Sequence, residues 1–110
     1  MKLPNCERAT VAREKITEYL LSTTHRHGGQ KAVFFLRYGF SRDSWADFAV
    51  ELRRHACIYD VAKVNTTEYG TPYRIEGPIN VPNGRRPLVR TVWMIDAGTD
   101  APRLISAYPI

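Results

Sequence analysis

The last part of the chain, Pro87–Ile110, reads PLVRTVWMIDAGTDAPRLISAYPI. It holds two apolar, β-branched runs, Leu88–Ile95 and Arg103–Tyr108, which flank the segment Asp96–Pro102 with its Gly, Asp and Pro residues. Two runs of this kind with turn chemistry between them are typical of a β-hairpin. The stretch therefore predicts an antiparallel hairpin around which the fold is organised.

One pairing of the two strands sorts the side chains of this hairpin by type. With Asp96 opposite Arg103, one face carries the apolar residues Val92, Met94, Ile105 and Ala107, and the other carries Thr91, Trp93, Ser106 and Tyr108. Opposite residues share a face, and a shift of one residue moves a whole strand's side chains to the other face. We expect the apolar face to pack on helices and the face with aromatic and hydroxyl groups to line a cleft.

The chain before the hairpin changes from helical to extended patterns. Apolar residues at helical spacing, such as Ile16, Tyr19 and Leu20, predict helices over about 11–21, 32–38 and 43–56. Alternating, β-branched segments predict strands over 59–68 and 73–81, and Asn83-Gly84 is a strong turn signal before the hairpin. The order predicts an α+β fold: N-terminal helices packed on one face of a four-stranded antiparallel sheet, as a single domain over 1–110.

The composition favours an anionic partner. The 110 residues contain 16 Lys plus Arg against 11 Asp plus Glu, which gives a formal net charge of +5. A basic balance of this kind is typical of proteins that bind nucleic acid. The N-terminal residues lack the apolar core of an export signal, and no run reaches membrane-spanning length, so we expect a cytoplasmic protein with no membrane contact.

The two cysteines, Cys6 and Cys57, are too few for a disulfide framework and lack metal-ligand spacing. We expect each to be a small, buried or half-exposed side chain. The acidic residues are scattered through the chain, and no motif gathers the several carboxylates that a two-metal nuclease centre needs. The sequence therefore predicts neither a metal nor a cofactor.

The segment His25–Lys31 carries the residues best suited to chemistry on RNA. RNA supplies its own nucleophile, the 2′-OH, so its cleavage needs a base, an acid and a cation but no metal. His25 or His27 could transfer the proton, because imidazole titrates near neutral pH. Lys31 could hold the phosphate at a helix N-terminus. The structural alternative is a solvated loop, and we expect His55 on the surface of the longest helix.

The closing hairpin offers groups that could complete such a site. Thr91, Ser106 and Tyr108 could hold phosphate oxygens, and Trp93 could stack a base. Arginines around the hairpin could form a rim that steers phosphates: Arg85, Arg86, Arg90 and Arg103. Two structural alternatives stay open. Trp93 and Tyr108 could be core aromatics, and Arg103 could form an ion pair with Asp96.

Several motifs resemble those of a known bacterial family. The first is the run from Tyr19 to Ala32, followed by Phe35 and Gly39-Phe40. The others are Tyr69-Gly-x-x-Tyr73, Pro82-Asn-Gly-Arg85, Val89-Arg-Thr91-x-Trp93 and Pro102-Arg-Leu104-x-Ser106-x-Tyr108. Together they cover nearly the whole chain. The pattern resembles the polymorphic-toxin domains at the C-terminal tips of adhesin-like and contact-dependent inhibition proteins, within the barnase-, colicin- and RelE-like ribonuclease superfamily.

The resemblance implies a helical N-terminal part, a four-stranded antiparallel sheet and metal-independent RNA cleavage. It points to five catalytic residues, His25, Lys31, Thr91, Ser106 and Tyr108, with Arg90 and Arg103 in support. The family pattern Asn-Pro-x-His-Pro is replaced here by Ser22-Thr-Thr-His25-Arg26, and the family often has Thr at Ser106. The nearby His27 leaves open which imidazole acts.

The resemblance is to a solitary version of such a toxin. A cell that carries a free ribonuclease needs a neutraliser, so we expect an acidic antitoxin or immunity protein that covers the basic cleft. The alternative function is a non-catalytic basic module that binds RNA or a protein, for which the arginines and Trp93 would serve equally well. A toxin that transfers a group is less favoured, because the chain has no Gly-rich nucleotide loop between a strand and a helix.

Overall fold

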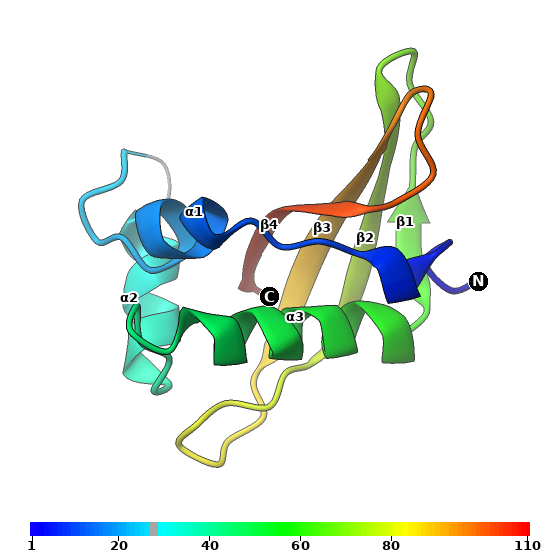
Figure 1. Ribbon diagram of the computed structural model, residues 1–110. Coiled ribbons are helices and arrows are strands. Elements are labelled where there is room, and N and C mark those ends of the chain that lie inside the picture. The colour runs from blue at the N-terminus through cyan, green and yellow to red at the C-terminus, as the bar shows by residue number, and fades with distance from the viewer. Residues whose placement is uncertain (27–28) are drawn as a thin grey trace.

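The computed structural model describes residues 1–26 and 29–110 (Figure 1). Its four strands are β1 (Val61–Val64), β2 (Gly70–Pro78), β3 (Leu88–Asp96) and β4 (Arg103–Pro109). They form one sheet in the order β1-β2-β3-β4, and each strand runs antiparallel to its neighbours. Helices cover one face of this sheet, which confirms the α+β prediction.

The helices lie in the N-terminal half, close to where the sequence places them. A short 3-10 helix, η1 (Cys6–Arg8), precedes α1 (Arg13–Lys15), which continues as the π-helix η2 (Ile16–Leu20). Helix α2 spans Gly29–Arg37 and α3 spans Trp45–Ile58. Figure 1 shows α3 lying across the sheet, with α2 beyond the β4 side. None of the helices in the described part of the chain is long and apolar enough to cross a membrane.

Aromatic side chains join the helices to the sheet. Phe35 of α2, Phe48 of α3 and Trp93 of β3 are fully buried. The rings of Phe40 and Phe48 stack with their centroids 4.1 Å apart. Their burial removes large apolar areas from water, and this is the main favourable contribution to folding.

The register of the closing hairpin differs from the prediction. Arg90 lies opposite Tyr108 and Val92 opposite Ser106, whereas beyond a β-bulge Trp93 lies opposite Leu104. The expected pairing of Asp96 with Arg103 is therefore wrong, and Arg103 lies opposite Met94 instead. The pairing differs from the expected one by one residue before the bulge and by two residues beyond it, because a bulge adds a residue to one strand. As a result the helix-facing side of β3 carries Val89, Thr91 and Trp93, and the opposite side carries Arg90, Val92 and Met94.

A chain of hydrogen bonds explains why a threonine occupies the core face. The indole N–H of Trp93 donates to Thr91 Oγ1 at 2.9 Å, and Thr91 Oγ1 lies 3.1 Å from His55 Nδ1. His55 Nε2 lies 3.0 Å from the Gly77 carbonyl oxygen. A carbonyl only accepts, so we assign the proton to Nε2, and Nδ1 then accepts from the Thr91 hydroxyl. His55 is fully buried, so the expectation of a surface position is wrong.

This buried imidazole predicts that the fold loses stability in mild acid. Desolvation lowers the pKa of His55, although hydrogen bonds to the Gly77 and Val89 backbone oppose the shift. The unfolded chain takes up a proton near pH 6.5, before the folded protein does. Stability should therefore be full above about pH 6.5 and should fall below it by at most about 1.4 kcal/mol per pH unit.

Denaturant unfolding between pH 5 and pH 8 measures this dependence. The control is His55→Gln, which removes the titrating group and keeps a side-chain amide that can donate to Gly77. The free energy of unfolding of the variant should be lower at pH 7.5. Between pH 6.5 and pH 5 its free energy of unfolding should fall less steeply with decreasing pH, by up to the contribution of one bound proton. Equal slopes in the two proteins would show that His55 is not the group responsible.

The first twelve residues, here called the N-terminal strap, cross the helix side of the sheet from β1 to β4 (Figure 1). Near β1 the Met1 carbonyl accepts from the Val61 N–H at 2.7 Å. At the other end the Thr10 carbonyl accepts from the Leu104 N–H at 3.0 Å, and Thr10 N–H donates to Pro102. The strap leads directly into α1 and η2 and so fixes where these helices sit against β4.

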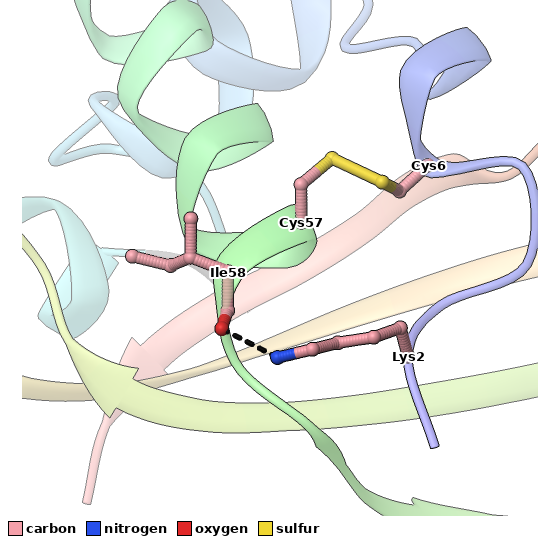
Figure 2. Close-up of a disulfide and its surroundings, with 4 residues drawn as sticks. All are labelled: Lys2, Cys6, Cys57 and Ile58. Atoms are coloured by element: carbon pink, nitrogen blue, oxygen red, sulfur yellow. Dashed lines mark hydrogen bonds between the residues drawn. A yellow bond between two sulfur atoms is a disulfide. The ribbon is translucent and has the colours of Figure 1, made fainter.

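A disulfide between Cys6 and Cys57 ties the strap to the end of α3 (Figure 2). The sequence led us to expect only small, buried or half-exposed side chains at both positions, and this link was not predicted. Their Cα atoms lie 5.5 Å apart although 51 positions separate them in sequence, and spacing along the chain does not reveal this proximity. Beside the disulfide, Lys2 Nζ donates to the Ile58 carbonyl at 2.7 Å (Figure 2).

Candidate functional site

A cleft of about 690 Å³ opens between η2, α2 and β4. We call it the Lys31 cleft. Its lining combines charged, hydroxyl and aromatic side chains from these elements, from α1, from the segment between η2 and α2 and from the end of the strap: Ala12, Glu14, Lys15, Glu18, Tyr19, His25, Lys31, Ile105, Ser106 and Tyr108. The cleft therefore joins the helical half of the chain to the closing hairpin.

Lys31 is held in this cleft by two hydroxyl groups. Its Nζ donates to Tyr19 Oη at 2.6 Å and to Ser106 Oγ at 3.0 Å. The two hydroxyl oxygens are themselves 3.2 Å apart, so the three groups form a closed triangle. An ammonium has three N–H donors. Two of them are used in the triangle, and the third can meet an anion in the cleft.

Tyr19 is the site residue that the sequence did not identify as functional. Its helical spacing with Ile16 and Leu20 indicated only a core position, and its ring does pack against the core. Partial burial would raise the pKa of Tyr19, but hydrogen bonds from Lys31 and Ser106, together with the charges of Lys31 and Lys15, lower it below its ordinary value. The one available signal was its place at the start of the Tyr19–Ala32 motif.

His25 and Tyr108 complete the polar lining around Lys31. The His25 ring meets the Tyr19 ring edge-on, with centroids 4.7 Å apart. The Lys31 Nζ lies 5.3 Å from the centre of the Tyr108 ring. A base that can transfer a proton, a cation and a phenol therefore border one cleft, which is the set of groups that acid–base chemistry at a phosphate requires.

Arg90 lies next to this group on β3. Its Nη1 donates to Tyr108 Oη at 3.3 Å, and its Nε donates to Glu76 Oε2 at 2.6 Å. Arg90 and Tyr108 are direct cross-strand partners, as are Glu76 and Arg90. The guanidinium therefore fixes the Tyr108 hydroxyl at the border between the Lys31 cleft and the sheet face that the helices leave open.

The structure brings together four of the five residues expected to be catalytic. His25, Lys31, Ser106 and Tyr108 line the Lys31 cleft. Thr91 does not, because it is fully buried on the other face of the sheet in its bonds to His55 and Trp93. Trp93 is also fully buried, so the core alternative holds for Trp93 and base stacking is excluded in this fold.

The expected arginine rim is not one surface. Arg103 donates to Asp96 at 2.7 and 3.0 Å, as in the structural alternative. Arg86 bonds Asn80 and Tyr59 near the loop between β2 and β3, and Arg85 lies in the same loop. Only Arg90 of this set contacts a residue of the Lys31 cleft within the described part of the chain. His27 falls outside the described residues.

Metal binding has no evident place in the described part of the chain. Among residues 1–26 and 29–110, no group of three or more His, Cys, Asp or Glu side chains could hold a metal ion. The Lys31 cleft is also lined by the carboxylates of Glu14 and Glu18, and its hydrogen-bond donors are the two ammonium groups of Lys15 and Lys31, hydroxyls and an imidazole. This set suits an anion, since ammonium and hydroxyl groups donate hydrogen bonds to phosphate oxygens.

The fold has a solved counterpart. A chain of the "Contact-dependent growth inhibition toxin - immunity protein complex from Klebsiella pneumoniae 342" is similar, with a TM-score of 0.73 and 18% sequence identity. The alignment covers 96% of each chain, so the likeness extends over the whole fold. No curated protein matches the chain in sequence.

A family model matches nearly the entire chain. The match extends over residues 2–110, so it includes the N-terminal strap except Met1, every residue of the Lys31 cleft and the closing hairpin. The chain belongs to the family described as "Domain of unknown function (DUF6883)".

Proposed function

We propose that this protein is a metal-independent RNA endonuclease that acts as a toxin and is neutralised by a cognate immunity protein. The observation that carries the proposal is the Lys31 cleft, where Lys31 is held by Tyr19 and Ser106 with His25 and Tyr108 beside it. The fold adds support, since the similar solved chain comes from a toxin–immunity protein complex.

The proposed reaction uses the 2′-OH of RNA as the nucleophile. His25 accepts the 2′-OH proton while O2′ attacks the adjacent phosphorus and forms the O2′–P bond. The P–O5′ bond breaks, and the leaving 5′ oxygen takes a proton from Tyr108. The products are a 2′,3′-cyclic phosphate and a 5′-OH, and no oxidant or metal enters the balance.

Lys31 supplies the positive charge at the phosphorus in this scheme. The phosphorane carries more negative charge on its oxygens than the starting phosphodiester, so a fixed ammonium stabilises it more than the substrate. Tyr19 and Ser106 hold the ammonium in place before substrate binds, which avoids a cost of reorganisation during the reaction. Arg90 acts through Tyr108, whose hydroxyl it contacts.

The immunity partner is proposed to be acidic and to cover the Lys31 cleft. The chain carries a formal net charge of +5, and opposite potentials across an interface steer association. A partner over the cleft would exclude RNA directly. The target RNA places the proposed action in the cytoplasm of the affected cell.

Induced expression in bacteria, followed by mapping of RNA ends, tests the proposed function. The wild-type protein should arrest growth and produce new 5′-OH ends at defined sites. His25→Ala should accumulate to the same level as a folded protein and should reduce these ends by at least about 10²-fold, the usual contribution of a proton-transfer group. Growth arrest without new RNA ends would contradict the nuclease and favour a non-catalytic binding module.

A further inference from the structure

One row of opposing residues crosses the whole sheet from the Lys31 cleft. Ser106 on β4 lies opposite Val92 on β3, Val92 lies opposite Arg74 on β2, and Arg74 lies opposite Lys63 on β1. Directly opposite residues share a face of the sheet. The row therefore connects the hydroxyl that holds Lys31 with two cations at the far edge of the same sheet, on the face that the helices leave open.

The two cations at the end of this row form an unusual pair. Like charges directly opposite each other in a sheet destabilise it. Neither Lys63 nor Arg74 forms an ion pair with any residue in the described part of the chain. Both side chains are exposed, and together with Asn65 and Pro72 they line a hollow of about 120 Å³. An anion in this hollow would relieve the repulsion.

We propose that Lys63, Arg74 and Asn65 form a second phosphate subsite, which binds the RNA chain away from the bond that is cleaved. This inference rests on the proposed ribonuclease function. Three inter-strand spacings of about 4.8 Å separate Ser106 from Lys63, which is roughly 14 Å. One nucleotide does not span this distance, but a short oligonucleotide does.

The residues between the two phosphate positions suit a nucleic-acid strand. Val92 and Met94 of β3 face the same side and are half-buried, so they offer apolar surface to bases. Arg90 lies two residues from Val92 along β3, on the same face and beside Tyr108. RNA would therefore meet cations at the cleft and at the subsite, with apolar side chains and the ion pair of Arg90 with Glu76 between them.

Charge reversal at Lys63 or Arg74 distinguishes a role in RNA binding from a role in stability. Lys63→Glu and Arg74→Glu each place opposite charges across β1 and β2, so each should unfold at a denaturant concentration no lower than that of the wild type. Both should nevertheless weaken RNA binding. The matched control is Arg53→Glu on α3, which changes the net charge equally on the helix side of the sheet.

Binding of a 2′-O-methyl RNA decamer, which cannot be cleaved, is measured at several salt concentrations. Each subsite variant should bind at least several-fold more weakly than the wild type, and its slope of log K against log salt should be smaller by about 0.7 or more, the value for one phosphate contact on a single strand. Arg53→Glu should keep the wild-type slope. Unchanged slopes in both subsite variants would overturn the subsite.

Cleavage of a decamer and of a dinucleotide separates this inference from the proposed function. The ratio of the two rates should fall in Lys63→Glu and Arg74→Glu, because only the decamer reaches the subsite. If the wild type binds the decamer and the two variants show the smaller salt slopes, but the wild type cleaves neither substrate, the nuclease would be refuted and the subsite would stand. A wild type that does not bind RNA would overturn both.

Discussion

Replacing Lys31 with methionine should reduce kcat/KM for RNA cleavage by about 10²–10³-fold. This is the usual effect of removing one preorganised donor from the charge that develops in a transition state. Methionine keeps most of the length of the lysine side chain and removes the ammonium that Tyr19 and Ser106 hold. The measurement is the initial rate of cleavage of a short RNA by the purified protein.

The fold should survive this substitution. The Tyr19 and Ser106 hydroxyls lie 3.2 Å apart, so they can bond to each other after the ammonium is lost. The thermal midpoint of Lys31→Met should therefore stay close to that of the wild type. Arg37→Met, a cation-to-methionine change at the other end of α2, is the matched control and should keep the wild-type rate. Wild-type kcat/KM in Lys31→Met would remove Lys31 from the mechanism.

Loss of the disulfide should lower the free energy of unfolding by about 4 kcal/mol in Cys6→Ala/Cys57→Ala. The link closes a loop of 51 positions, and it restricts the unfolded chain much more than the folded one. Denaturant unfolding of the variant and of the oxidised wild type measures the difference. The same experiment on the wild type with a reducing agent should give a similar loss.

The reduced protein should still be folded at 25 °C. The strap remains attached through Met1 to β1 and through Thr10 to β4, and Lys2 keeps its bond to Ile58. Disulfides persist in oxidising compartments and are reduced in the cytosol. A protein that acts on cytoplasmic RNA would therefore work without this link. Equal stability of the oxidised protein and the double variant would show that the strap does not depend on the disulfide.

The fold class was predictable because local patterns and long-range packing agree in this chain. Helical spacing in 45–52 and alternation in the hairpin each follow from burial on one face, and the structure places α3 and the four strands accordingly. The hairpin register was not predictable by sorting residue types. That reasoning assumes that the buried face is apolar. Thr91 is nevertheless buried, because its hydroxyl bonds to His55, which is distant in sequence, and to Trp93, which is two positions away.

The site was predictable to the extent that residue chemistry marks it. His25, Lys31, Ser106 and Tyr108 were expected and do line one cleft. Tyr19 was missed because a half-buried tyrosine on a helix has the same spacing as a core residue, and only its contact with Lys31 reveals its second role. The disulfide was missed for a similar reason, since proximity in space between Cys6 and Cys57 leaves no mark on their spacing.

The identity of the RNA ends produced by the purified protein in EDTA tests the central claim most directly. The wild-type protein should cleave RNA at the same rate with EDTA as with Mg²⁺ and should leave 2′,3′-cyclic phosphate and 5′-OH ends, and the yield should fall by about 10²–10³-fold in Lys31→Met. Ends that carry a 5′-phosphate, or activity that disappears in EDTA, would contradict cleavage by 2′-OH attack in the Lys31 cleft.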